Sequence, residues 1–315
     1  MRILVYGAGV LGSYLAHVLI QGKNDVTVLA RGQRLGELKE QGLIIRHYLQ
    51  LKTTKDKVNV IDELRLNDKY DIIFVVMQYT HLPSVLPVLA QNQSQYILFV
   101  GNNADPKATQ EYLLHNSTTE KQVAFGFQST GGRRENGKVI CVRAGGHMEL
   151  GGLNGSLSWK PLINKIFMNT RYKLTYFDNM DAWCKCHIAL IMPLCHAAYI
   201  YNGDMRQVGR DKRLLHQIIA AMDEGYRVLE NNGYPLTPAN EADLVRRKRR
   251  LFYIMLKIIS MTPLGRLAIS DHAMSAVEEM TTLNDAFDSL KRQAHISTPN
   301  WDAIIEKNTK VGKYK

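Results

Sequence analysis

Three glycines near the start of the chain have the spacing of a phosphate-binding turn. Gly7, Gly9 and Gly12 follow the apolar run Arg2 to Tyr6 and precede an apolar helical pattern that stops at Gly22. The first glycine of such a turn permits a sharp bend, the second lets the backbone approach a pyrophosphate, and the third lets helix and strand pack closely. Amide groups at the helix N-terminus attract the phosphates. The pattern predicts a dinucleotide site formed by Gly7, Ala8, Gly9, Val10, Leu11 and Gly12.

The end of the next expected strand, Asp25 to Ala30, indicates which dinucleotide is bound. NAD sites usually have Asp or Glu about 20 residues after the glycines, where it binds the ribose 2′-hydroxyl. Here Arg31 occupies that place, Arg34 lies nearby, and no carboxylate is present. A guanidinium group matches a 2′-phosphate in charge and in bidentate geometry. We expect Arg31 to bind that phosphate and NADP(H) to be the cofactor, the alternative being a solvated arginine pair.

A doubly wound parallel sheet is expected to position these residues. Buried-strand patterns recur at 71–77 (DIIFVVM) and 96–100 (YILFV), and the second leads into Gly101-Asn102. Ligands of such sheets lie at the carboxyl ends of the strands. Asn102 is therefore a candidate site residue, unless its side chain only stabilises the turn. Residues 122–152 alternate strands with glycine turns, and we expect them to pair antiparallel at the sheet edge.

Helical patterns dominate after about residue 157. They cover 160–169, 181–201, 214–232, 238–260, 273–295 and 300–307. Strands in the first half and helices in the second predict two domains, an α/β Rossmann domain over 1–174 and an all-α domain over 175–315. A cleft between two such domains is a common place for a ligand.

Composition places the chain among ordinary globular proteins. Of its 315 residues 45% are hydrophobic and 22% are charged, and the net charge of +11 favours anionic partners. The longest apolar stretch, 187–200, is interrupted by Pro193 and His196 and is shorter than the ~20 residues that span a bilayer. The cysteines show no secreted framework, so a cytoplasmic protein with reduced thiols and no membrane partner is expected.

The densest positive charge, Arg246 to Arg250, lies inside a helical pattern. It predicts the solvated face of a long helix rather than a nucleic-acid site, because no known binding module surrounds it. Cys184, His187 and Cys195 share a helical face, which raises the possibility of a metal. The outer two would lie roughly 16 Å apart along a helix, however, whereas Zn–S bonds are near ~2.3 Å. No metal site is expected.

Taken together, the chain resembles the ketopantoate reductase family (2-dehydropantoate 2-reductases) over nearly its full length. The matching segments are GAGVLG, Ala30-Arg31, Gly101-Asn102, Trp183-x-Lys185, Glu279-Met280 with Leu283-Asn284, and Thr298-Pro299-Asn300. The resemblance implies a Rossmann domain joined to an all-helical domain like the C-terminal domain of 6-phosphogluconate dehydrogenase. It also implies reduction of a 2-keto acid by NADPH, with ketopantoate to pantoate, a step of pantothenate biosynthesis, as the best single expectation.

The resemblance assigns roles to four residues. Lys185 matches the catalytic lysine, which donates a proton to the carbonyl oxygen as hydride reaches the carbon; a surface lysine is the alternative. Asn102 matches an asparagine that places substrate and nicotinamide. Glu279 matches a glutamate that contacts cofactor or substrate, although its neighbour Glu278 leaves the register open. Gln78 stands where the family often has a lysine, in the cofactor site.

The chain also departs from the family. Ala189 and Pro193 occupy the positions of two asparagines that hold the substrate, and neither side chain can form a hydrogen bond. His196 would share a helical face with Lys185 and could replace them, or it could be a core histidine. The family's serine could be Ser260 or Ser270.

These departures leave alternatives open. The protein could reduce a different small carbonyl or an imine, or it could be a non-catalytic sensor that binds NADP(H). The long helices of the second domain could form a homodimer, and no nucleic-acid partner is expected.

Overall fold

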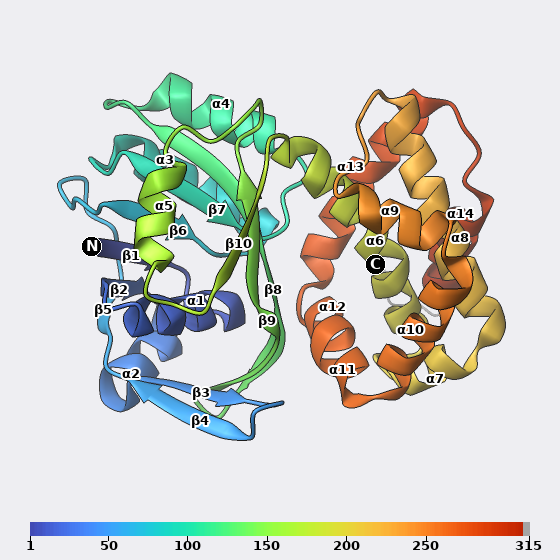
Figure 1. Ribbon diagram of the computed structural model, residues 1–315, viewed down its shortest axis with the longest axis horizontal. Helices are drawn as coiled ribbons and strands as arrows, with labels where there is room; N and C mark the ends of the chain where they lie inside the picture. Colours follow the sequence, from blue (N-terminus) through green and yellow to red (C-terminus); the bar gives the residue numbers. More distant parts are fainter. Residues whose placement is uncertain (311–315) are drawn as a thin grey trace. The chain divides into compact units, whose positions relative to one another are not determined.

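The computed structural model describes residues 1–310, which form two compact units that divide between Met180 and Asp181 (Figure 1). The expected boundary at residue 174 falls inside β10 (Lys173–Phe177). This strand pairs in parallel with the sheet of the first unit and therefore belongs to it. The division comes only where α6 (Met180–Ile200) begins.

The first unit is built on a parallel sheet of six strands in the order β5-β2-β1-β6-β7-β8. In chain order this is the 3-2-1-4-5-6 arrangement of the dinucleotide-binding fold. The centres of β1, β2, β6 and β7 are apolar because both faces of the sheet are covered there; Ile3, Leu4 and Val5 have no exposed surface. Their bounds are β1 Arg2–Tyr6, β2 Asp25–Leu29, β5 Asn59–Ile61, β6 Ile72–Val75, β7 Tyr96–Val100 and β8 Gln122–Glu135.

Helices follow most of these strands and contribute to the core. Side chains of α1 and α5 form one apolar cluster with alternate strand residues such as Phe74 and Leu98. The ring of Phe167 in α5 meets that of Phe74 edge-on, with centroids 6.1 Å apart. The helical bounds are α1 Val10–Gln21, α2 Gly32–Gln41, η1 Tyr79–His81, α3 Leu82–Gln91, α4 Pro106–Asn116 and α5 Lys160–Phe167.

Residues 122–152 pair antiparallel, as expected, but the expectation that they form an edge of the sheet is wrong. They form a long hairpin of β8 and β9 (Lys138–Gly151), and the sheet continues beyond it. The first half of β9 pairs with β3 (Leu43–His47), which pairs in turn with β4 (Lys52–Asp56), and its second half pairs with β10. The polar sequence of β4 gave no strand signal, and the partners of β9 are distant in sequence, so neither could be predicted locally.

The second unit is all-helical, and two of its expected helices are divided. The range 238–260 separates into α9 and α10, because the backbone N–H groups of Arg247 and Lys248 both bond to the carbonyl of Asp243 and end α9 there. The range 273–295 is interrupted at Ala276. The bounds are α7 Met205–Arg210, α8 Lys212–Asn231, α9 Ala239–Arg246, α10 Arg249–Met261, α11 Pro263–Gly265, the π-helical turn η2 Arg266–Ser270, α12 Asp271–Ser275, α13 Val277–Ala294 and α14 Pro299–Lys310.

The helix α6 runs through the core of this unit. It continues across Pro193, so it is longer than the apolar stretch seen in the sequence. By length and composition alone it could span a membrane, but 72% of its most apolar window is buried inside the protein. Elsewhere in the described chain, only α10 taken together with 263–275 would pass the same test, and these two segments meet at an 87° bend. Burial of α6 identifies it as a core helix.

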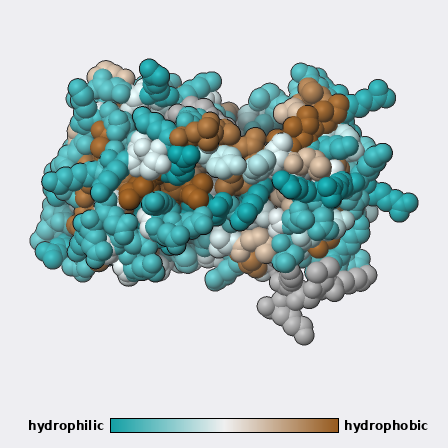
Figure 2. All heavy atoms as spheres, turned by 90° about the horizontal axis from the view of Figure 1, so that it is seen from below, coloured by the Kyte–Doolittle hydropathy of each residue, from teal (hydrophilic) through white to brown (hydrophobic). Residues whose placement is uncertain are grey.

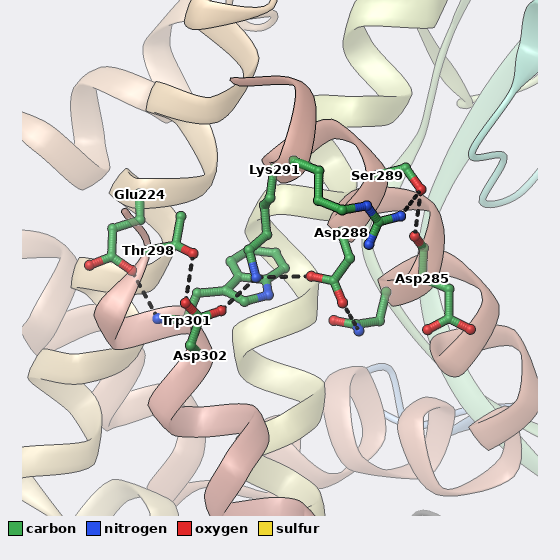
Figure 3. Close-up of polar contacts among 10 residues, drawn as sticks. Glu224, Asp285, Asp288, Ser289, Lys291, Thr298, Trp301 and Asp302 are labelled. Atoms are coloured by element: carbon green, nitrogen blue, oxygen red, sulfur yellow. Dashed lines mark hydrogen bonds and ion pairs between the residues drawn. The ribbon is translucent and has the colours of Figure 1, made fainter. Parts of the chain in front are cut away.

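A polar network fastens the start of α14 to α8 (Figure 3). The buried carboxylate of Glu224 accepts hydrogen bonds from the backbone N–H groups of Asn300 (3.1 Å) and Trp301 (2.9 Å). It also accepts one from the Asn300 side chain at 2.6 Å. The Trp301 ring stacks on Phe287 of α13, with centroids 4.6 Å apart. The segment Thr298-Pro299-Asn300 is therefore the anchored N-terminus of a helix.

A second part of this network joins α13 to α14. Lys291 lies between two carboxylates, with its Nζ 2.9 Å from Asp288 and 2.5 Å from Asp302 (Figure 3). The Thr298 hydroxyl donates to Asp302 at 3.0 Å. These contacts hold the first turn of α14 against α13.

Replacing Glu224 with Ala is expected to destabilise the helical unit by about 2–4 kcal/mol, because two backbone N–H groups would lose their acceptor in a buried place. Urea unfolding followed by tryptophan fluorescence and circular dichroism measures the change. The control is Glu278→Ala, an exposed glutamate of α13, which should change stability by less than about 0.5 kcal/mol. Equal stability of the two variants would contradict the anchoring role of Glu224.

Candidate active site

The first unit contains a cavity of about 780 Å³ at the carboxyl ends of β1 and β2. Its floor is the glycine turn, and one wall is the tip of the β8–β9 hairpin. In the sheet, β1 has β2 on one side and β6 on the other, so the chain reverses its winding direction here. Such a switch point is where doubly wound sheets bind ligands.

The three glycines of the turn differ in what surrounds them. A Cβ atom at Gly7 would lie 2.1 Å from the carbonyl oxygen of Val76, and one at Gly12 would lie 1.9 Å from that of Gly7. A Cβ at Gly9 would meet no protein atom within 4 Å, and Gly9 lines the cavity. Gly7 and Gly12 are therefore required by packing, whereas Gly9 leaves space for a ligand.

The start of α1 supplies the polar groups for that ligand. The helix begins at Val10, so its first amide N–H groups have no intrahelical partner. They carry the positive end of the helix dipole, which suits a pyrophosphate. The residues of the turn thus fit the predicted dinucleotide, Val10 and Leu11 through their backbone and Ala8 as part of the cavity lining.

The two arginines after β2 have different surroundings. Arg31 is exposed, lines the cavity, and donates to the hydroxyl of Tyr6 at 3.2 Å. Burial raises the pKa of that hydroxyl, and the guanidinium of Arg31 opposes the shift. A side chain at the rim with a single side-chain partner can turn toward a phosphate, so Arg31 remains the candidate for the 2′-phosphate.

Arg34 is a structural residue instead. It is only 5% exposed, and its guanidinium donates to the carbonyls of Ala8 (3.3 Å) and Gly137 (2.9 Å). Further bonds join it to the Ser13 hydroxyl at 3.2 Å and to Glu37 at 3.0 Å. Burial lowers the pKa of Arg34, and Glu37 opposes this effect. Because its N–H groups are bonded to both segments, Arg34 holds the glycine turn against the β8–β9 hairpin.

Residues at the tip of the β8–β9 hairpin also line the cavity, and the sequence pattern gave no indication of this. Arg134 and Asn136 line the cavity beside Gly137. Asn136 and Gly137 both have positive φ, 49° and 75°, as a two-residue hairpin turn requires. The Asn-Gly pair is a recognisable turn signal, but only the long-range pairing of the sheet places this turn beside the glycines.

Asn102 and Gln78 follow the next two strands of the sheet. Asn102 is 8% exposed, and its Oδ1 has no hydrogen-bond partner in the described chain. The neighbouring Asn103 stabilises the turn, because its side chain accepts from Asp105 N–H and donates to Thr109. The amide of Asn102 is thus available to a ligand. Gln78 precedes η1, between two residues of the cavity wall, Met77 and His81.

Lys185 lies in the second unit and is not a surface lysine. It is 6% exposed, and its ammonium donates to the carboxylate of Asp181, one turn earlier in α6. Its Nζ also lies 5.0 Å from the centre of the Tyr234 ring. Asp181 is 1% exposed. The carboxylate and the ring hold the ammonium in one place. We did not predict this pair, although its spacing of four residues is a signal that the sequence contains.

Glu279 lies on α13 in the same unit. It is 1% exposed, whereas Glu278 is exposed, so the buried carboxylate is that of Glu279. Its Oε2 lies 3.7 Å from Nε2 of His272. Burial, with the nearby charge of Glu279, raises the pKa of Cys195 to about 12. Glu279 and Lys185 thus contact different neighbours within the helical unit.

The positions that depart from the family are filled by packing. Ala189 has no exposed surface. A Cβ atom added at Gly225 of α8 would lie 3.0 Å from the Cβ atom of Ala189. His196 is a core histidine: it is 2% exposed, Asn308 bonds to its Nδ1 at 3.2 Å, and burial lowers its pKa to about 4. Pro193 is buried as well. We find no replacement for the asparagines in His196.

The candidate serines and cysteines are also part of the core. Ser270 donates to the carbonyl of Gly203 at 2.8 Å, while Ser260 is fully buried against α7. Burial raises the pKa of the Cys184 thiol to about 12 and lowers that of His187 to about 3. Among the described residues no group of three His, Cys, Asp or Glu side chains could hold a metal ion.

A Rossmann unit with an open glycine turn, followed by a helical unit with a buried lysine, defines an oxidoreductase class that binds a nicotinamide dinucleotide. Residues 3–155 match the model of the family "Ketopantoate reductase PanE/ApbA". The chain is 23% identical over 244 residues to 2-dehydropantoate 2-reductase of Archaeoglobus fulgidus, which covers 76% of this chain and 78% of that protein. Nearly half of the chain therefore matches the ketopantoate reductase family, as its motifs indicated, and that family uses NADPH.

Solved structures show the same fold over the full length. The ternary structure of D-mandelate dehydrogenase with NADH and anilino(oxo)acetate has a TM-score of 0.74 at 17% identity and covers 98% of both chains. 2-Dehydropantoate 2-reductase from Methylococcus capsulatus has a TM-score of 0.73 at 16% identity, covering 100% of this chain and 98% of that one. A dimeric ketopantoate reductase from Staphylococcus aureus has a TM-score of 0.69 at 11% identity, with 98% of both chains covered. The predicted fold class is confirmed.

Gly9→Ala is expected to weaken NADPH binding at least ~10-fold, because the added methyl group enters the space beside the helix N-terminus where a pyrophosphate must approach. Stability should be nearly unchanged, since no protein atom lies within 4 Å of the new Cβ. Titration of the fluorescence of NADPH measures the affinity, and thermal unfolding measures the stability. The matched variant Gly12→Ala should lose stability instead. Unchanged affinity in the Gly9 variant would place the pyrophosphate elsewhere.

Proposed function

We propose that the protein reduces a small 2-keto acid with NADPH, with ketopantoate to pantoate, within pantothenate biosynthesis, as the first candidate. The observation that carries this proposal is the open turn at Gly9, which lines a large cavity at the switch point of the sheet. The residues of this sheet lie within the segment that matches the ketopantoate reductase model. The family match supports the reaction class, and the turn supports the cofactor.

The residues of the helical unit supply the proton. NADPH, when bound, supplies the hydride that reduces the carbonyl carbon. Lys185 holds a proton on Nζ and gives it to the carbonyl oxygen, which would otherwise carry a negative charge. Asp181 fixes the ammonium and balances its charge in a buried place. Proton transfer from a fixed donor lowers the barrier because little reorganisation is needed.

Other side chains orient the reactants in this proposal. Asn102 offers an unpaired buried Oδ1 at the end of β7, which suits a donor such as an amide or hydroxyl group. The carboxylate of Glu279 can accept from a hydroxyl or an amide in the same way. Arg31 holds the 2′-phosphate at the rim of the cavity, and Gln78 lies near the end of β6.

The substrate is the least constrained part of the proposal. Ala189 and Pro193 cannot form the hydrogen bonds that a hydroxylated acid would need, so such a site discriminates weakly in favour of ketopantoate. The structural likeness to D-mandelate dehydrogenase with anilino(oxo)acetate supports a second candidate, a 2-keto acid with an apolar substituent. We also propose a cytoplasmic homodimer with no nucleic-acid or membrane partner, in line with the dimeric ketopantoate reductase of the same fold.

NADPH oxidation, followed by absorbance, is the first test of this function. The panel contains ketopantoate, 2-keto acids with apolar substituents, other ketones and imines. Oxidation of NADPH is expected with a 2-keto acid, and Lys185→Ala should reduce kcat at least ~100-fold, the usual effect of removing a general acid. NADPH affinity should stay nearly constant, because the turn that binds the cofactor belongs to the other unit.

Lys173→Ala is the control, since this exposed lysine of β10 takes no part in the proposed chemistry. Turnover that survives Lys185→Ala would remove Lys185 from the mechanism. Tight NADPH binding without oxidation by any compound of the panel would favour a cofactor-binding sensor over an enzyme.

Arg31→Ala is expected to lower the affinity for NADPH about 10–100-fold and to leave the affinity for NADH nearly unchanged, because only NADPH carries the 2′-phosphate. Competitive titration of both cofactors measures the ratio. The control is Arg65→Ala, an exposed arginine whose side chain pairs with Glu63. An equal loss for both cofactors would show that Arg31 acts through the fold of the turn and not through the phosphate.

A further inference from the structure

The tip of the β8–β9 hairpin brings an arginine to the cofactor cavity. Arg134 lines this cavity together with Gly9 and Arg31. In the antiparallel ladder Arg134 is opposite Val139, so both side chains lie on one face of the hairpin. Val139 has no exposed surface and belongs to the apolar core that contains Leu38 of α2. Arg134 therefore projects from the side of the hairpin that packs against α2.

The turn next to Arg134 is held in place by α2. The guanidinium of Arg34 donates to the carbonyl of Gly137 at 2.9 Å. A Cβ atom at Gly137 would lie 3.2 Å from the side-chain oxygen of Gln41 and 3.7 Å from the carboxyl carbon of Glu37. Burial lowers the pKa of Arg34, Glu37 opposes this shift, and the charge of Arg134 adds to the lowering. The fixed turn thus places Arg134 close to the first turn of α2.

The carboxylates of the cavity lining are already paired. Glu37 accepts from the buried Arg34 at 3.0 Å. Glu135 accepts from two N–H groups of Arg133, at 3.1 and 3.2 Å. The negative charges at the cavity are therefore balanced by arginines that do not need a ligand.

Two cations of the lining keep their charge for a ligand. Among the described side chains, no carboxylate lies at ion-pair distance from Arg31 or Arg134. The helix α2 begins at Gly32, directly after Arg31, and no side chain of the described chain caps its N-terminus. Its first N–H groups carry the positive end of the helix dipole, and Gln33 of this turn lines the cavity. The cavity thus offers an anion two guanidinium groups and a helix N-terminus.

The surroundings of α2 are polar as well. In Figure 1 this helix lies near the lower edge of the first unit, and Figure 2 shows that edge from below, where hydrophilic side chains, in teal, predominate. The charged end of a ligand at this rim of the cavity stays in contact with water, which lowers the cost of bringing an anion there.

We propose that Arg134 is a second cation for the 2′-phosphate of NADPH, so that the preference for this cofactor depends on Arg134 as well as on Arg31. A phosphate monoester carries about −1.5 to −2 charges near pH 7. Two guanidinium groups and a helix N-terminus match such a group in charge and in hydrogen-bond donors. This inference rests on the NADPH-dependent function proposed above.

The pyrophosphate is the other anion of the cofactor that Arg134 could bind. The space for a pyrophosphate, however, lies at the start of α1, where a Cβ atom at Gly9 would meet no protein atom within 4 Å. Arg134 is instead a neighbour of α2, through Arg34 and through the packing of Gly137. NADH and NADPH share the pyrophosphate and differ in the 2′-phosphate, so the two possibilities predict different effects on the two cofactors.

The stability of the cofactor-free protein separates a binding role from a structural one. The guanidinium groups of Arg31, Arg34 and Arg134 border one cavity, and like charges repel one another when no anion is bound. The described chain shows no hydrogen bond from the Arg134 side chain. Arg134→Ala should therefore leave the unfolding temperature of the cofactor-free protein unchanged or slightly raised, whereas loss of a structural residue would lower it.

The test measures the affinities of the full-length protein for NADPH and for NADH by isothermal titration calorimetry. Arg134→Ala should weaken NADPH binding about 10-fold, the effect of losing one charge-assisted contact, and change NADH binding less than ~2-fold. Arg134→Lys should keep part of the affinity for NADPH, because the charge remains while the bidentate geometry is lost. Lys138→Ala, which removes an exposed cation of the same hairpin outside the cavity lining, is the matched control and should leave both affinities unchanged.

An equal loss for both cofactors in the Arg134→Ala variant would assign this arginine to the pyrophosphate, or to the fold if the unfolding temperature also falls. An unchanged affinity for NADPH would remove it from the site. Each of these results overturns the inference and leaves the proposed function standing. Equal affinities of the unchanged protein for NADPH and NADH would instead contradict the NADPH preference itself.

Discussion

The cavity of the first unit depends on one buried cation, the guanidinium of Arg34. Its bonds reach the carbonyl of Ala8 in the glycine turn, Ser13 on α1, Glu37 on α2 and the carbonyl of Gly137 at the hairpin tip. A cation this deeply buried is costly unless nearly all of its donors are satisfied. The desolvation cost of this cation is offset only when the glycine turn, α1, α2 and the hairpin tip are all in place. The contacts that stabilise Arg34 therefore also define the cavity wall.

This arrangement explains why two arginines close in sequence serve different purposes. The N–H groups of Arg34 are hydrogen-bonded within the protein. Arg31 instead lies at the rim of the cavity, with a tyrosine hydroxyl as its side-chain partner. A sequence pattern gives the charge of both residues but not their burial. Burial depends on Gly137, about a hundred positions further along the chain, whose neighbour Arg134 also lines the cavity. The positive potential near the expected 2′-phosphate is therefore a product of long-range sheet pairing.

Features that depend on contacts between near neighbours in the sequence could be predicted, and features that depend on distant residues could not. The strand, glycine turn and helix over residues 2–21 are set by contacts between near neighbours, and their bounds and packing requirements could be predicted. Lys185 with Asp181, one helical turn apart, is of the same kind. The position of the β8–β9 hairpin could not be predicted, because β3 and β10 pair with it from distant parts of the chain. The break between α9 and α10 was missed because two N–H groups share one carbonyl, a detail that periodicity does not encode.

The positions at which the chain departs from the family are closely packed. Gly225 of α8 lies beside Ala189 of α6, and even a Cβ at Gly225 would come within 3.0 Å of the Ala189 Cβ. The contact is therefore too close for an amide side chain at position 189. Restoring an asparagine at position 189 would therefore require α6 and α8 to separate, and overpacking of a close contact costs typically ~1–3 kcal/mol. His196 is bound to Asn308 and kept neutral by burial, so it belongs to the same core. In the proposed function, polar recognition of a substrate must therefore come from residues outside that part of α6, and Asn102 and Glu279 are the side chains that we propose for it.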